Sequence, residues 1–130
     1  MKIFALCGIV LFLLFTSVQF NDPDPYIWVP VYLFPAIMSY FVFRGKYFFY
    51  LLAIVSGFYL CYSLATFPPS FMAWVSDELN NESLSMKTPS MEVARESLGC
   101  MICFVFLAIY AIGYLVNKEE SYKKIEKVEE

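Results

Sequence analysis

Histidine is absent from this chain of 130 residues, and charged residues are scarce at 16% of the composition. Soluble domains average about 25% charged residues. The hydrophobic fraction of 60% and the mean hydropathy of +0.62 therefore exclude a water-soluble domain and a disordered chain. The lack of histidine removes the commonest general base and the commonest metal ligand. No strongly basic patch is present, which argues against nucleic acid as a partner.

Four long apolar runs occupy most of the chain. A helix rises about 1.5 Å per residue, so a hydrocarbon core of about 30 Å takes about 20 residues to cross. Runs of that order lie at residues 3–20, 26–43, 47–67 and 97–116. They are apolar on all faces, whereas the strands of a membrane barrel alternate. We therefore predict an all-α membrane protein, a four-transmembrane-helix bundle at residues 1–116 with a charged cytoplasmic tail at residues 117–130.

The first apolar run begins like a signal peptide, because Lys2 precedes it. The run is longer than the core of a usual signal peptide. Residues 16–20, Thr-Ser-Val-Gln-Phe, also lack the small residues of a cleavage site. We expect this run to be retained as the first membrane helix.

Basic residues are distributed unequally between the two ends of the predicted bundle. Four crossings place seven of the nine on one side, namely Lys2, Arg44, Lys46, Lys118, Lys123, Lys124 and Lys127. The positive-inside rule then places both termini in the cytoplasm. The Met-Lys-Ile-Phe start and the short length favour a bacterial inner membrane.

The connections between the runs carry further signals. The short hairpin around Gly45 predicts that the second and third helices pack as antiparallel neighbours. In the outer loop at residues 68–96, Ser70 is a typical cap for a short interfacial helix over residues 71–79. A second cap-and-proline pair, Thr88 and Pro89, predicts that the last helix begins above the bilayer.

Two features of the predicted helices concern packing. Pro30 and Pro35 lie inside the second helix and free backbone carbonyls, which neighbouring helices must satisfy in a membrane. Ala53, Gly57 and Cys61 repeat at four-residue spacing in the third helix. Such a stripe of small residues is typical of close helix packing, so we expect a neighbouring helix against it.

A polar cluster is predicted at the outer end of the bundle, and it is the strongest candidate for a binding site. Carboxylates around one arginine can hold a lipid headgroup or another polar ligand. The alternative interpretation is structural: Asp24 caps a helix and Arg95 bridges two hairpins. The residues of the cluster come from the exit of the first helix, the second helix and the entry of the last: Gln19, Asn21, Asp22, Asp24, Trp28, Tyr32, Glu92, Arg95 and Glu96.

Cys100 and Cys103 form a C-x-x-C pair in the last helix, a spacing used by thiol oxidoreductases. Their surroundings are apolar, whereas redox-active cysteines prefer accessible, electropositive sites. Buried structural cysteines are therefore the favoured interpretation. The sequence assigns no catalytic residue, no metal ligand and no cofactor.

Two short segments carry a resemblance to a known family. Residues 19–24, Gln-Phe-Asn-Asp-Pro-Asp, followed by Trp28 and Tyr32, resemble the opening of the transmembrane protein 220 family. Residues 95–99, Arg-Glu-Ser-Leu-Gly, resemble that family's segment entering its last helix. The resemblance implies a small multi-pass membrane protein and supplies no enzyme class.

Three functional hypotheses follow. The leading one is a non-enzymatic accessory subunit of other membrane proteins, or a binder of a lipid or small ligand, that uses the outer polar cluster. The second is a membrane enzyme that acts on a lipid headgroup through the outer carboxylates. The third is a thiol redox protein that uses Cys100 and Cys103.

Overall fold

The computed structural model describes residues 1–80 and 89–129, and every regular element in those ranges is helical, as predicted. The elements are α1 (Lys2–Val18), the 3-10 turn η1 (Gln19–Asn21), α2 (Pro25–Phe43), α3 (Phe49–Ala65), α4 (Phe71–Leu79) and α5 (Pro89–Glu129). Three of the described segments are long and apolar enough to cross a membrane: Lys2–Asn21, Pro25–Phe43 and Met91–Glu129.

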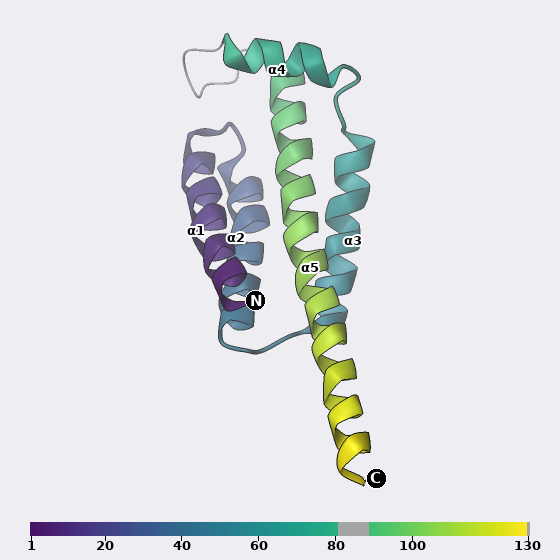
Figure 1. Cartoon of the computed structure of the whole chain (residues 1–130). Coiled ribbons are helices and arrows are strands. Elements are labelled where there is room, and N and C mark those ends of the chain that lie inside the picture. Colours follow the sequence, from purple (N-terminus) through teal and green to yellow (C-terminus); the bar gives the residue numbers. More distant parts are fainter. Residues whose placement is uncertain (81–88, 130) are drawn as a thin grey trace.

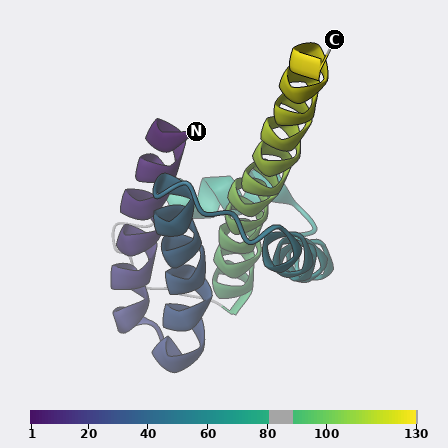
Figure 2. The same ribbon diagram turned by 90° about the horizontal axis from the view of Figure 1, so that it is seen from below.

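The helices are arranged as two pairs, which both views of the ribbon show (Figures 1 and 2). One pair is α1 with α2, and the other is α3 with α5. Helix α2 also contacts α5, whereas its contacts with α3 are sparse. The prediction that the second and third helices pack as antiparallel neighbours is therefore wrong for their backbones, although single side chains of α3 reach α2. The connection over residues 44–48 is long enough to carry the chain across to the far side of α5 (Figure 2).

Helix α3 is shorter than the apolar run that predicted it. It covers 17 residues, Phe49–Ala65, rather than residues 47–67. Pro68 disfavours helical backbone at the residue before it, so the helix ends early, with Thr66 as its C-cap. At about 1.5 Å per residue, α3 is about 25 Å long, slightly less than the thickness of a typical hydrocarbon core.

Helix α2 runs continuously through Pro30 and Pro35. The ring of Pro35 leaves the carbonyl of Val31 without its helical N–H partner. The hydroxyl of Tyr59, on α3, donates a hydrogen bond of 2.5 Å to this carbonyl oxygen. The expectation that a neighbouring helix satisfies a carbonyl freed by proline is confirmed at this position.

The core lies around the middle of α5, where Cys103, Leu107 and Tyr110 are fully buried. The hydroxyls of Tyr110 and Ser39 are hydrogen-bonded at 2.8 Å, which links α5 to α2. Both hydroxyls also lie against Gly8 of α1. This contact allows three helices to approach one another because Gly8 has no side chain.

The predicted small-residue stripe of α3 faces away from the bundle. Ala53 and Cys61 are exposed, and a Cβ atom added at Gly57 would meet no atom within 4 Å. The expectation of a neighbouring helix against this stripe is wrong for this chain. The opposite face of α3 is buried instead, and there Ser63 and Ser97 each donate a hydrogen bond of 2.8 Å to the other's carbonyl oxygen.

The connection between α3 and α5 contains the short helix that the sequence predicted. Helix α4 starts after Ser70, whose side chain accepts a hydrogen bond of 3.4 Å from the backbone N–H of Ala73. It lies across the bundle at the end where α5 begins, called here the α4 end (Figure 1). Helix α5 begins at Pro89, as predicted, while the predicted cap Thr88 lies outside the described residues.

Candidate functional site

A pocket of about 360 Å³ lies between α1 and α5 at the α4 end, and we call it the α1–α5 pocket. Its volume is within the range of pockets that hold small ligands. Five of the nine predicted site residues line it, and the full lining is Phe15, Val18, Gln19, Asp22, Tyr32, Trp74, Glu78, Arg95, Glu96, Leu98, Gly99 and Ile102.

Arg95 forms the strongest polar contact in this pocket. Its Nε atom donates to Oε1 of Glu78 at 2.6 Å, and one terminal nitrogen donates to Oε2 at 2.8 Å. This two-point geometry matches the planar guanidinium to the planar carboxylate. Both side chains are about one-fifth exposed, so the pair is partly shielded from solvent. The pair joins α4 to α5 and fixes one wall of the α1–α5 pocket.

Asp22 lies in the turn that follows η1 and is half-buried. Burial raises the pKa of its carboxyl above the ordinary value, and the charge of Glu92 acts in the same direction. The Arg95 guanidinium opposes this change in pKa only in part. The direction of the change in pKa is set chiefly by burial, which disfavours the charged form of the carboxyl.

Glu96 stands between the α1–α5 pocket and a second pocket on the other side of α5. This second pocket, of about 490 Å³, is called here the α2–α3 pocket. The hydroxyl of Tyr62 donates a hydrogen bond of 2.9 Å to Oε2 of Glu96. The residues that line the α2–α3 pocket are Asp24, Ile27, Trp28, Val31, Val55, Phe58, Tyr59, Tyr62, Glu96 and Cys100.

The predicted cluster is thus divided between two pockets. Asp24 and Trp28 line the α2–α3 pocket, while Asn21 and Glu92 line neither pocket. Asp24 occupies the N-cap position of α2, but its carboxylate accepts a 3.1 Å hydrogen bond from the Tyr26 hydroxyl instead of capping the helix. The sequence indicated that these residues meet at one end of the bundle, and it did not show that they line two pockets on different sides of α5.

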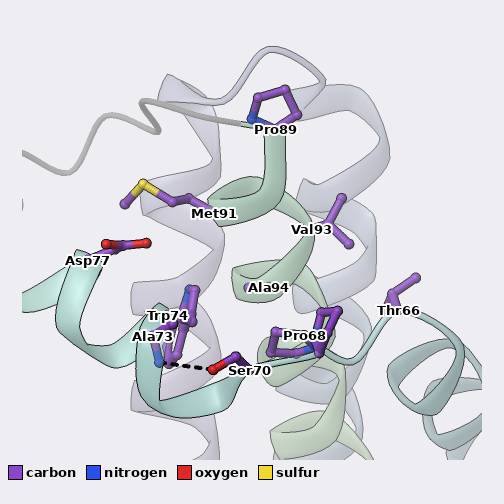
Figure 3. A pocket seen from close by; sticks show the side chains of 11 residues that line it. Thr66, Pro68, Ser70, Ala73, Trp74, Asp77, Pro89, Met91, Val93 and Ala94 are labelled. Atoms are coloured by element: carbon purple, nitrogen blue, oxygen red, sulfur yellow. Dashed lines mark hydrogen bonds between the residues drawn. The ribbon is translucent and has the colours of Figure 1, made fainter.

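The lining of these pockets includes residues that the sequence did not indicate as site residues, and three of them make or offer polar contacts there. Glu78 and Trp74 come from α4, and Tyr62 comes from α3. Glu78 could have been suspected from the sequence, because a lone arginine such as Arg95 needs a carboxylate partner. Trp74 also lines a larger pocket, of about 570 Å³, between α4 and the first turns of α5 (Figure 3). Its indole nitrogen is buried and has no hydrogen-bond partner among the described residues.

The cysteine pair lies in the core. Cys100 and Cys103 are free thiols that are 3% and 0% exposed. A thiol that exchanges with a partner must be reachable by it. Nothing in the surroundings of these two side chains therefore favours the redox hypothesis.

Comparison with known protein families gives a match. The model of the family described as "Transmembrane family 220, helix" matches residues 11–112, which is more than half of the chain. No curated protein and no solved structure matches the chain. The matched range contains α2 and α3 and reaches into α5, including the residues that line both pockets from Phe15 to Ile102. The apolar helices agree with this assignment, and the chain therefore belongs to Transmembrane family 220 and is a membrane protein.

Proposed function

We propose that this protein is a non-enzymatic binder of an amphipathic molecule, such as a lipid, whose polar head lies in the α1–α5 pocket. The observation that carries the proposal is the change from polar to apolar lining along this pocket. Gln19, Asp22, Glu78 and Arg95 lie at the α4 end, while Phe15 and Ile102 lie deeper along their helices.

The distance over which the pocket lining changes from polar to apolar suits a molecule with a polar head and an apolar chain. From Arg95 to Ile102 the helix advances about 10 Å toward the middle of the bundle. An alkyl chain placed beside Phe15 and Ile102 would contact apolar side chains, as it would in the bilayer. The head would then lie beside Gln19 and Asp22, whose side-chain oxygens accept hydrogen bonds. A head group with hydroxyl or amine donors fits this end best.

The first test replaces Arg95 with alanine. The change removes both hydrogen bonds to Glu78 and leaves its half-buried carboxylate without that partner, so the pocket wall loses its fixed geometry. We expect the amount of lipid retained through purification in mild detergent to fall about five- to tenfold, which corresponds to about 1–1.4 kcal/mol of binding free energy. Mass spectrometry of extracted lipid measures the ratio of lipid to protein.

Arg44→Ala is the matched control for this experiment. It removes the same charge from an exposed position at the other end of the bundle and should leave lipid retention unchanged. Size-exclusion chromatography must show the same monodisperse peak for both variants. Equal lipid retention by Arg95→Ala and the wild type would contradict the proposed site. Co-purification of a protein in place of a lipid would instead favour the accessory-subunit hypothesis.

We also propose that the chain crosses the membrane four times, with both termini in the cytoplasm. Helix α2 ends at the end opposite α4, and α5 begins at the α4 end (Figure 1). If both helices span the bilayer, the chain must return between them, and α3 makes this return while packed along α5. Residues outside the helix, such as Tyr47 and Phe67, flank α3 and add to its reach. Exposed Lys2, Arg44 and Lys46 at the end opposite α4 support the orientation.

Cysteine labelling tests the orientation. Met72 of α4 is 75% exposed, and Arg44 is exposed at the opposite end. In intact bacterial cells, a membrane-impermeant maleimide should label the Met72→Cys variant and not the Arg44→Cys variant. After permeabilisation it should label both, and the wild-type chain provides the background from its four native cysteines. Labelling of the Arg44→Cys variant and not of the Met72→Cys variant in intact cells would indicate the opposite orientation and would contradict the proposal.

A further inference from the structure

The α2–α3 pocket differs in chemistry from the α1–α5 pocket, although Glu96 lines both. Among the described residues that line it, none is basic, and two carboxylates lie at its α4 end, from Asp24 and Glu96. Its walls carry four aromatic rings, from Trp28, Phe58, Tyr59 and Tyr62. The pocket therefore combines negative charge with aromatic surface.

The aromatic walls are held in place by specific contacts. The rings of Trp28 and Tyr62 meet edge to face at a centroid distance of 5.9 Å. The Tyr62 hydroxyl is bound to Glu96, and the Tyr59 hydroxyl is bound to the Val31 carbonyl. These bonds engage the hydroxyl protons of both tyrosines. The pocket thus has the aromatic and negatively charged character of a cation site and few donors for an anionic group.

Among the described residues, the hydrogen-bond partners of these two carboxylates are neutral. Asp24 accepts from the Tyr26 hydroxyl and Glu96 from the Tyr62 hydroxyl. Trp28 is 8% exposed, whereas Phe58 is 71% exposed and Ile27 is 50% exposed. The aromatic floor is therefore buried, and the rim opens outward between α2 and α3, helices that make few direct contacts with each other.

We propose that the α2–α3 pocket binds the methylated ammonium head of an amphipathic molecule, with its alkyl chain along Val31, Val55 and Phe58. A quaternary ammonium group has no N–H to donate and is attracted to aromatic faces and carboxylates. From Asp24 to Val31 the helix advances about 10 Å, so the charged and apolar ends of the pocket are separated along α2. This site is distinct from the one in the proposed function.

Tryptophan fluorescence provides the direct test. The chain contains two tryptophans, so a Trp74→Phe background leaves Trp28 in the pocket as the reporter. The protein in maltoside micelles is titrated with dodecanoylcholine and, separately, with 3,3-dimethylbutyl dodecanoate, in which carbon replaces the charged nitrogen. We expect a saturable change in emission with the choline ester and affinity at least about tenfold weaker for the uncharged isostere. Equal affinities, or no saturable change with either compound, would overturn the proposal.

Choline itself separates an amphipathic ligand from a water-soluble one. Because choline lacks the alkyl chain, it should produce no saturable change at the concentrations that saturate dodecanoylcholine. Saturation by choline at those concentrations would overturn the assignment of an alkyl chain to Val31 and Val55.

A pair of neighbouring substitutions locates the ligand. Asp24→Asn removes one carboxylate from the α2–α3 pocket, and the Asp24 side chain makes no capping hydrogen bond that α2 would lose. We expect affinity for dodecanoylcholine to fall about tenfold. Asp22→Asn makes the same chemical change two residues earlier, in the lining of the other pocket, and should leave this affinity unchanged. An equal loss from both substitutions would indicate attraction to the acidic end of the bundle in general and would overturn the site.

Discussion

Replacing Gly99 with alanine is expected to destabilise the fold and to distort the α1–α5 pocket. A Cβ atom at this position would overlap the Tyr32 hydroxyl oxygen and would lie 2.8 Å from the ring carbon that carries it. Tyr32 is 4% exposed, and its ring packs edge to face on Phe15 at 5.5 Å. The ring therefore has little room to move, and either α5 or α2 must shift. Overpacking of this kind costs about 1–3 kcal/mol.

The measurement is the free energy of unfolding in mixed detergent micelles, followed by circular dichroism. Gly57→Ala is the matched control, because it adds the same methyl group to α3 at a position with no atom within 4 Å. That variant should be as stable as the wild type or more so, since alanine favours helix over glycine by up to about 1 kcal/mol. The double variant Gly99→Ala/Tyr32→Phe should recover part of the loss, because it removes the atom in closest contact. Equal stability of the two single alanine variants would contradict the close approach at Gly99.

The location of the helices could be predicted from the sequence, because length and hydropathy determine it. Proline and serine signals also located α4 and the start of α5 correctly. The pairing of the helices could not be predicted. The apolar runs are hydrophobic on all faces, so their periodicity does not reveal which side faces the bundle. For the same reason the stripe around Gly57 was assigned to a helix interface, although it faces outward, while Gly8 and Gly99 make the close approaches.

The sequence predicts where the candidate site lies, at one end of the bundle. It does not predict that the site residues are divided between two pockets. Residues at the ends of helices are polar in most membrane proteins, so their clustering at one end follows from topology alone. That Asp22 and Asp24 line different pockets depends on how α5 packs against the α1–α2 pair. That Arg95 contacts Glu78 depends on α4 lying across the bundle. Both are properties of tertiary packing, which residue types and spacing do not specify.

The second large effect is expected at Phe12, in the middle of α1. Its side chain is 0% exposed and packs edge to face on Phe106 of α5 at 5.1 Å. Phe106 in turn stacks on Phe4 of α1 at 4.4 Å. These rings join α1 to α5 through side chains, since the backbones of the two helices are not closely packed. Phe12→Ala should therefore leave a cavity at this junction and lower the free energy of unfolding by about 3–5 kcal/mol.

Leu13→Ala is the matched control, one residue further along the same helix. Leu13 is 49% exposed, so in the membrane its side chain lies against lipid tails in place of other helices. Lipid tails are as apolar as leucine, and its removal should change stability far less than the loss of Phe12. Unfolding in mixed micelles, measured on both variants under the same conditions, decides the outcome. A loss at Leu13 equal to that at Phe12 would mean that α1 presents its other face to a neighbour and that α1 does not join the bundle through Phe106.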